Sequence, residues 1–205
     1  MKHLLENWRE YLLTEGMMDV DDLPEDVYIR IVEESSTVTS FRYVDRQGKR
    51  RMSMSHEPPW GIVRIEKAVA APAGDGPCDG AWVVAQSAAT TGWGPLLYDV
   101  AIEWATKNGN GLTADRYTVS KSAQAVWDYY LNKRGDVSDH QLDDMDNTLT
   151  SIDADNCVQK HMVTGPDASQ LKKSPLSKRY TKSPDIINKL KQINKLWYPY
   201  VEFLE

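Results

Sequence analysis

The chain has 205 residues, of which 41% are hydrophobic and 26% charged, and its 30 acidic residues outnumber its 24 basic ones. This length suits one domain or one domain with appendages, and the ordinary globular composition excludes wholesale disorder. No apolar run approaches the roughly 20 residues that cross a bilayer, and the opening MKHLLENWREYLL mixes charges with its leucines, unlike a signal peptide. We therefore expect a cytoplasmic protein with no membrane partner.

The N-terminal segment predicts an amphipathic helix over residues 2–14, followed by a linker. Its apolar side chains recur at helical spacing, and its other face carries charges of both signs. The apolar members are Leu4, Leu5, Trp8, Leu12 and Leu13. Because the polar face carries acids as well as bases, docking on the protein's own domain or on a partner is favoured over membrane-surface binding.

A run of strands is predicted from residue 27 onward. The apolar period changes to two at 27–32 and again at 38–44, and a further strand is predicted at 62–69, after the Pro58-Pro59 break. The short apolar run 82–85 is typical of a central strand buried on both faces. These elements predict four or five mainly antiparallel strands.

A glycine turn follows the apolar strand. Gly92-Trp93-Gly94 stands directly before a helix that has Pro95 at its first turn. Two glycines let the backbone turn tightly, and the free N–H groups at the helix start can hold a phosphate with the help of the helix dipole. Glycines also make strand-to-helix corners that bind nothing, so the motif alone leaves both interpretations open.

The order of elements continues beyond this helix. Gly109-Asn110-Gly111 ends it, 112–116 is a candidate short strand, and Ser120 or Ser122 caps a further helix that stops near Gly135. The buried stripe of that last helix is Ala123, Val126, Trp127, Tyr130 and Leu131.

From about Ala81 to Val137 this arrangement resembles the GNAT superfamily of acyl-CoA N-acyltransferases. In that family a central strand ends in a Gln/Arg-x-x-Gly-x-Gly/Ala turn that holds the CoA pyrophosphate. A helix, a strand and a helix of the form Asn-x-x-Ala-x-x-hydrophobic-Tyr follow. Here Ala89 replaces the Gln or Arg and Ser122 replaces the Asn, while Pro95 removes one backbone donor. The resemblance implies an α+β fold with a mixed, mostly antiparallel sheet flanked by helices.

The resemblance also implies acetyl-CoA, or another acyl-CoA, as cofactor and a primary amine as acceptor. A backbone N–H on the central strand polarises the thioester carbonyl, and a helix tyrosine protonates the departing thiolate. That tyrosine is Tyr130 or Tyr129, with Tyr130 preferred because it lies on the apolar stripe; a core aromatic role stays open. The implied cofactor-binding residues are Ala85, Ser87, Gly92, Trp93, Gly94 and Leu96.

The general base is harder to place. Glu66 is the first choice because its predicted strand lies beside the cofactor strand. Asp99 and deprotonation through a water molecule are the alternatives. A strand glutamate is also a common solvated residue. No metal centre is expected, because Cys78 and Cys157 are far apart and the four histidines show no i, i+4 pairing.

Charge is uneven toward the C-terminus. Residues 136–156 contain seven aspartates and no Lys or Arg, whereas Lys172 to Lys195 includes eight basic residues and only Asp185 as an acid. The basic segment is either an electrostatic handle for nucleic acid or is neutralised by the chain's own acidic stretch.

The C-terminal elements complete the predicted organisation. We expect a last strand at 157–164, a mobile connection at 165–182 and a helix from Ser183-Pro184-Asp185 to Trp197. The sequence therefore predicts that the chain has three units. They are 1–24, the N-terminal helix and linker; 25–164, the acyltransferase-like domain; and 165–205, the basic connection and amphipathic C-terminal helix.

Three functions fit this sequence. The first is a GNAT-type N-acetyltransferase. The second is a catalytically inactive GNAT-like structural or assembly protein of a bacteriophage particle, whose terminal helices contact a virion partner or a second copy. The third is a phage DNA-modification protein of the Mom type, favoured by the basic segment Lys172 to Lys195. The ENWREYL-type opening is similar to proteins of tailed bacteriophages, which implies the host cytoplasm or the virion as location.

Overall fold

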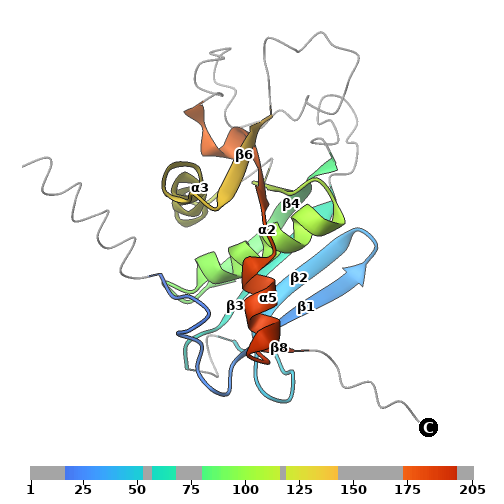
Figure 1. The fold of residues 1–205 in the computed structure, drawn as a ribbon, viewed down its shortest axis with the longest axis vertical. Coiled ribbons are helices and arrows are strands. Elements are labelled where there is room, and N and C mark those ends of the chain that lie inside the picture. Colours follow the sequence, from blue (N-terminus) through green and yellow to red (C-terminus); the bar gives the residue numbers. More distant parts are fainter. Residues whose placement is uncertain (1–16, 53–56, 68–79, 116–118, 143–172, 198–205) are drawn as a thin grey trace, which may run out of the picture.

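The computed structural model describes residues 17–52, 57–67, 80–115, 119–142 and 173–197. These residues form an eight-stranded sheet and three α-helices (Figure 1). The strands are β1 (Tyr28–Ser35), β2 (Val38–Val44), β3 (Gly61–Lys67), β4 (Trp82–Ala89), β5 (Leu112–Thr113), β6 (Val137–Gln141), β7 (Lys178–Lys182) and β8 (Leu196–Trp197). The helices are α2 (Gly94–Asn108), α3 (Lys121–Lys133) and α5 (Asp185–Gln192). The helix expected at 2–14 and the strand expected at 157–164 lie outside the described residues.

The sheet runs in the order β6-β7-β5-β4-β3-β2-β1-β8. Neighbours are antiparallel except for two parallel pairs, β4 with β5 and β1 with β8. The helix α2 connects β4 to β5, as a parallel pair requires. The expectation of an α+β fold with a mostly antiparallel sheet is confirmed, and β4 lies inside the sheet.

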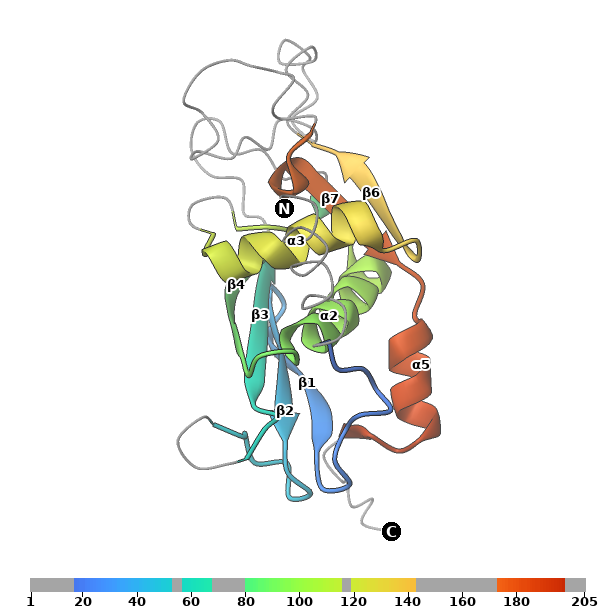
Figure 2. The same cartoon turned by 90° about the vertical axis from the view of Figure 1, so that its left-hand side faces the viewer.

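The helix α2 packs on one face of this sheet (Figures 1 and 2). Its Trp104 meets Phe41 of β2 and Trp82 of β4 edge-on, with ring centroids 5.9 and 4.9 Å apart. The period-two pattern places Phe41 and Tyr43 in this core while Arg42 remains half-exposed on the other face. Burial of these large aromatic side chains holds α2 against β2 and β4, and thereby sets the position of the first turn of α2 relative to the sheet.

The segment expected to be a mobile connection contributes a strand. Residues 178–182 form β7 between β5 and β6, and β6 itself comes from the acidic stretch, where no strand was expected. The expectation of a connection is therefore wrong for 178–182. This strand shares one sheet with the strands that precede residue 142.

Several basic residues of the C-terminal segment contact the rest of the protein. Lys195 donates to the backbone carbonyls of residues 24, 25 and 27. Other lysines form ion pairs, two of them with the acidic stretch. These pairs are Lys178–Asp139, Lys182–Asp136, Lys182–Glu103 and Lys189–Asp21. The contacts favour internal neutralisation over a free electrostatic handle.

The C-terminal helix is shorter than expected. It ends at Gln192 because Asn194 takes a φ of 54°, a left-handed conformation that asparagine tolerates better than most residues. The chain then pairs Leu196 and Trp197 with β1 as the short strand β8. Ile193, directly after the helix, is exposed.

Candidate functional site

The strand β4 loses its neighbour on one side partway along its length. It pairs with β3 from Trp82 to Ala89, but with β5 only at Trp82 and Val83. In the part of the chain that the structure describes, no strand continues the pairing on the β5 side beyond Val83. Residues 85–88 are exposed although β4 lies inside the sheet. Because backbone N–H and C=O groups need partners, this stretch can pair with an extended ligand.

A β-bulge lies at the start of the unpaired stretch. Arg64 pairs with Gln86 and Ile65 pairs with Val84, which leaves Ala85 as an extra residue on β4. A bulge removes one residue from the ladder and bends the strand locally. It therefore releases the backbone of Ala85 from β3 at the point where β4 and β5 separate.

The glycine corner after β4 is held by its own backbone and by the core. Trp93 N–H donates to Thr90 O at 3.0 Å, and Gly92 takes a φ of 82°, which favours glycine. Tyr43 donates its hydroxyl proton to Trp93 O at 2.8 Å, and the two rings pack edge-on. Trp93 is thus an anchor of the corner, with a buried side chain.

One of the backbone donors expected to bind a cofactor at the corner is wrong. The N–H of Trp93 is used within the turn and does not face a ligand. Among the described residues, none accepts from the N–H groups of Gly92, Gly94 or Leu96. The first N–H groups of a helix have no partner within the helix and carry its positive dipole end. Of these three residues, Gly92 and Gly94 line the cavity described next, whereas Leu96 is buried and does not line it.

A chamber of about 400 Å³ opens beside this corner. One side is the corner at the start of α2, and the other is the start of α3, where Ser120 and Ser122 contribute to the lining. Ser120 caps α3 by accepting from the Ala123 N–H at 3.2 Å. Two helix N-termini therefore meet one cavity, which we call the corner chamber, and both favour negative charge.

A second chamber of about 450 Å³ adjoins the first along β4. It shares Ser87, Tyr98, Ser120 and Ala123 with the corner chamber, and we call it the strand chamber. Its other lining residues are Val84, Ala85, Gln86, Asp115, Val119 and Trp127. Together the two chambers form a cleft that follows the unpaired side of β4, hereafter the β4 cleft.

The tyrosine hydroxyl that reaches this cleft belongs to α2. Tyr98 lines both chambers, and its hydroxyl lies 3.0 Å from Ser87 Oγ across the cleft floor. Burial raises the pKa of Tyr98, which keeps its hydroxyl protonated at neutral pH. This tyrosine was not among the residues expected from the sequence.

The two tyrosines expected to act as acid lie elsewhere. The Tyr130 hydroxyl is buried within hydrogen-bond distance of Pro95 O (3.0 Å) and Asp99 Oδ1 (3.1 Å). Burial, and then Asp99, raise the pKa of Tyr130 well above its ordinary value. Neither Tyr129 nor Tyr130 lines the described part of the cleft, and Trp127 is the aromatic residue that α3 contributes there. Tyr130 thus has the core role that the sequence left open.

The carboxylates considered as general base also lie outside the cleft. Glu66 pairs with Arg64 at 2.6 Å, and it is half-exposed on β3. Asp99 is buried against Arg134, which lies 3.1 Å away, and burial raises the pKa of Asp99. The carboxylate that lines the cleft is Asp115, two residues after β5, and no charged group besides it appears in the described lining.

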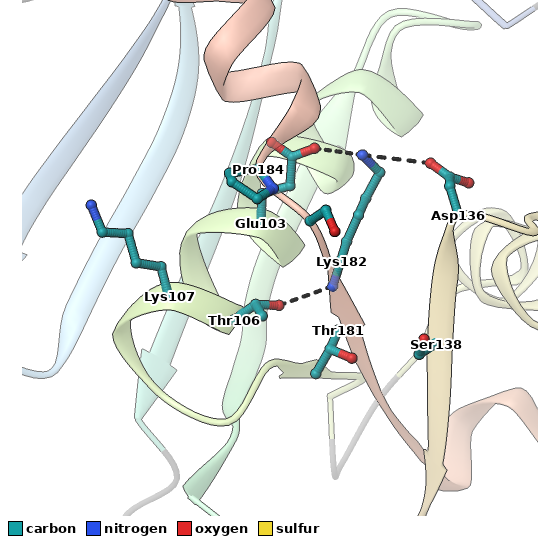
Figure 3. Close-up of a pocket in the computed structure, with 9 residues that line it drawn as sticks. Glu103, Thr106, Lys107, Asp136, Ser138, Thr181, Lys182 and Pro184 are labelled. Atoms are coloured by element: carbon teal, nitrogen blue, oxygen red, sulfur yellow. Dashed lines mark hydrogen bonds and ion pairs between the residues drawn. The ribbon is translucent and has the colours of Figure 1, made fainter.

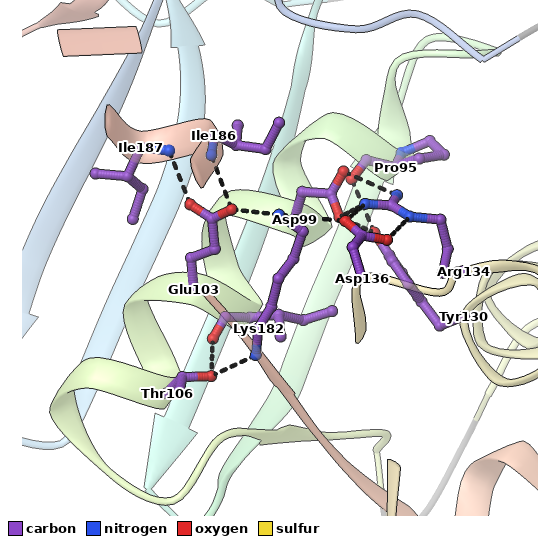
Figure 4. A network of polar contacts seen from close by, with 11 residues as sticks. Pro95, Asp99, Glu103, Thr106, Tyr130, Arg134, Asp136, Lys182, Ile186 and Ile187 are labelled. Atoms are coloured by element: carbon purple, nitrogen blue, oxygen red, sulfur yellow. Dashed lines mark hydrogen bonds and ion pairs between the residues drawn. The ribbon is translucent and has the colours of Figure 1, made fainter. Parts of the chain in front are cut away.

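A separate hollow of about 410 Å³ lies where α2, β7 and α5 meet (Figure 3). Three of its charged groups, Glu103, Lys182 and Asp136, interact with one another. Lys182 bonds to Glu103 at 2.5 Å, and Glu103 also accepts from the N–H groups of Ile186 and Ile187 at the start of α5 (Figure 4). Asp136 lies 3.5 Å from Lys182 on the other side. These contacts join α2, β7 and the start of α5 to one another.

Comparisons with protein-family models, with curated proteins and with solved structures found no match to this chain. Across the described residues, no helix is long and apolar enough to cross a membrane, and no group of His, Cys, Asp and Glu side chains could hold a metal ion. Cys78 and Cys157 lie outside the described residues.

The structure brings together most of the backbone positions expected to bind a cofactor. Ser87 and Ala85 line the strand chamber, and Gly92 and Gly94 line the corner chamber. It adds the side chains of Tyr98 and Asp115, which the sequence did not single out. Asp115 lies two residues after β5, which pairs parallel with β4. Its position beside β4 therefore follows from the order of the strands in the sheet, which the local sequence does not reveal.

Proposed function

We propose that the protein is an acyl-CoA-dependent N-acyltransferase of the GNAT type, transferring an acetyl or other acyl group to a primary amine. The observation that carries the proposal is the unpaired side of β4, which leads directly to a glycine corner and two helix N-termini around one cleft. Backbone amides at helix starts bind phosphate without needing basic side chains. The order from β4 through the corner, α2, β5 and α3 is the order that the resemblance implies.

The parts of an acyl-CoA fit the cleft in sequence. Its pyrophosphate belongs at the N–H groups of Gly92 and Gly94, which line the corner chamber together with Ser120 and Ser122 at the start of α3. Its extended pantetheine arm pairs with the free edge of β4. This arrangement brings the thioester near the bulge at Ala85, whose released backbone can polarise the carbonyl oxygen.

The chain's own tyrosine for this chemistry is Tyr98. Its protonated hydroxyl lies inside the cleft, between the corner chamber and the strand chamber, and Ser87 orients it. Tyr129 and Tyr130, which the resemblance suggested for protonation of the leaving thiolate, do not line the described cleft. We therefore assign the general acid to Tyr98 in this proposal.

Thermal unfolding with and without cofactor tests the cleft. A ligand that binds only the native state at about 100 times its Kd stabilises it by about 2.7 kcal/mol. For a chain of this length, that free energy raises Tm by roughly 5–10 °C. We expect this shift with about 1 mM acetyl-CoA or CoA. If neither compound shifts Tm, the proposal fails.

A substitution at Gly94 locates the binding site. A Cβ added at Gly94 lies 3.8 Å from Ala89 Cβ, an ordinary contact, so a side chain can be accommodated without strain. Gly94→Leu extends that side chain into the corner chamber and should abolish the cofactor-induced shift in Tm. Gly135→Leu is the matched control, because a Cβ at Gly135 meets nothing within 4 Å and Gly135 lies outside the cleft lining. It should retain the full shift.

A second candidate is a protein that binds the cofactor without turnover, as a GNAT-like structural or assembly protein of a phage particle would. The observation that favours it is the presence of Trp127 in the cleft where the resemblance suggests a tyrosine from α3. A cofactor-induced rise in Tm without release of free thiol in the presence of primary amines would support this candidate. Release of one thiol for each acylated amine would exclude it.

A further inference from the structure

Tyr43 contacts the glycine corner from the core of the protein. It lies on β2, 50 residues before Trp93, and its side chain is fully buried. Its ring packs edge-on against the Trp93 ring at 5.8 Å, and its hydroxyl donates to Trp93 O at 2.8 Å. Burial, and then the negative charge of Asp99, raise the pKa of Tyr43 well above its ordinary value, so the hydroxyl keeps its proton. Tyr43 is not part of the described lining of either chamber, so it acts on a ligand only through the corner.

The bond from Tyr43 sets the direction of one peptide group. The peptide between Trp93 and Gly94 is trans, so its C=O and N–H point in opposite directions. Because Trp93 O points into the core toward the Tyr43 hydroxyl, the Gly94 N–H points away from the core. Gly94 lines the corner chamber, which gives this N–H access to a ligand there.

The start of α2 has no side-chain cap of its own. Its N-cap residue is Trp93, whose indole group donates a hydrogen bond and cannot accept one. At α3, by contrast, the Ser120 hydroxyl accepts a bond from a backbone N–H of the first turn. The Gly94 N–H of α2 therefore stays available to a ligand, and its direction determines what the corner presents to an anion.

The opposite orientation of this peptide is sterically accessible. Rotating the peptide changes the ψ of Trp93 and the φ of Gly94, and glycine adopts positive and negative φ about equally readily. The rotated peptide turns Trp93 O toward the chamber, where its partial negative charge repels a phosphate. Loss of the Tyr43 hydroxyl leaves Trp93 O without its donor in the core, which favours the rotated orientation.

We propose that Tyr43 is a positioning residue of the corner chamber: its hydroxyl holds the Trp93–Gly94 peptide so that the Gly94 N–H faces a bound diphosphate. This inference rests on the proposed acyl-CoA-dependent function and deepens it. Tyr43 touches no ligand, so part of the affinity for the cofactor comes from a core residue of β2 that acts through one main-chain group.

The test removes the hydroxyl and measures CoA binding by isothermal titration calorimetry. Tyr43→Phe keeps the buried ring and loses only the donor. The apparent Kd rises in inverse proportion to the fraction of protein in the binding orientation. Since a buried hydrogen bond changes such an equilibrium by about tenfold, we expect Tyr43→Phe to raise the Kd for CoA by about tenfold.

Tyr180→Phe is the matched control. The Tyr180 hydroxyl is also buried and donates to a backbone carbonyl, Pro175 O, at 2.6 Å. Tyr180 is not part of the described cleft lining. The same chemical change there should lower Tm to a similar extent. Because the bond that it removes does not involve the corner, it should alter the Kd for CoA by less than about twofold.

A substitution at the corner distinguishes positioning from a loss of packing. Gly94→Ala disfavours positive φ at residue 94, which opposes the rotated peptide, and its Cβ makes an ordinary contact at 3.8 Å with Ala89 Cβ. In the Gly94→Ala background, Tyr43→Phe should therefore raise the Kd for CoA by less than about threefold. A purely structural role of Tyr43 predicts the same rise in both backgrounds.

The outcomes separate this inference from the function on which it rests. Circular dichroism first confirms a wild-type-like unfolding transition for each variant. The role of Tyr43 is overturned if Tyr43→Phe binds CoA with the wild-type Kd, if Tyr180→Phe weakens binding as much, or if Gly94→Ala does not reduce the effect. In each of these cases the cofactor cleft stands. If CoA does not bind the wild type, the proposed function itself fails.

Discussion

The buried pair of Glu103 and Lys182 gives the sharpest prediction of stability. Their side chains are 0% and 1% exposed, and they join α2 to β7 (Figure 4). Replacing Glu103 by Leu leaves the ammonium of Lys182 buried, and among the described residues its remaining ion pair is the one with Asp136 at 3.5 Å. Breaking a buried pair from one side costs about 3–5 kcal/mol because the remaining charge is uncompensated.

The same substitution also removes the acceptor for the start of α5. Ile186 and Ile187 donate their N–H groups to Glu103 at 2.9 and 2.8 Å. These donors gain water when α5 frays, which limits the added cost to about 1 kcal/mol. We expect Glu103→Leu to lower the free energy of unfolding by about 4–5 kcal/mol in total. That loss lowers Tm by roughly 10–15 °C in a chain of this length.

The partner substitution should be milder. Lys182→Met leaves Glu103 with its two backbone donors, and the carboxylate can take up a proton because burial already raises the pKa of Glu103. We expect a cost of about 1–2 kcal/mol. The double variant has no unpaired charge, so it should be more stable than Glu103→Leu alone by at least about 1 kcal/mol.

Urea unfolding followed by circular dichroism measures these differences. Asp21→Asn is the control, because the Lys189–Asp21 pair is exposed and exposed pairs contribute about 0–1 kcal/mol. Equal costs for Glu103→Leu and Lys182→Met, or a cost below about 1 kcal/mol for Glu103→Leu, would refute the reasoning, since either result means that Lys182 reaches solvent when its partner is lost.

Two further predictions concern the cleft and the sheet edge. Ser120→Ala removes the N-cap of α3 and should cost about 1 kcal/mol in thermal unfolding, whereas Ser120→Asp should restore the cap; equal stability of Ser120→Ala and wild type would contradict the capping role. Arg134 lowers the pKa of Asp136 from 3.8 to about 2, so the stabilisation by Asp136 is complete above about pH 4 and is lost as pH falls toward 2. Because Asp136 is half-exposed, screening reduces the contribution to about 1 kcal/mol. Asp136→Asn should therefore be less stable than wild type at pH 5 and equally stable near pH 2, as measured by urea unfolding across that range.

The C-terminal segment shows why sequence patterns missed part of the sheet. The buried positions of β7 are Lys178, Tyr180 and Lys182, and this alternation does not have the apolar period that predicts burial. In β7, Lys178 and Lys182 occupy buried positions because Asp139, Glu103 and Asp136 lie opposite them. Those partners come from distant parts of the chain, so local composition could not reveal them.

The tyrosines of α3 illustrate the same limit within the candidate site. Their helical spacing correctly placed Tyr130 on the buried stripe. Spacing alone could not tell a tyrosine that faces a cleft from one that bonds to Pro95 and Asp99 in the core. Tyr98 lies on the buried face of α2, where its sequence position predicts an ordinary core residue. Only the structure places its hydroxyl beside Ser87 in the cleft.

By itself the sequence determined the local elements from the first strand to the helix before Gly135, because apolar periodicity, the glycine corner and the serine cap act over a few residues. Only the tertiary structure decided that β4 and β5 separate after two paired residues, that two helix starts meet at the corner chamber, and that Asp115 lines the adjoining strand chamber. The physical reason is that strand pairing and side-chain direction depend on contacts between residues far apart in the chain, which short-range patterns do not encode.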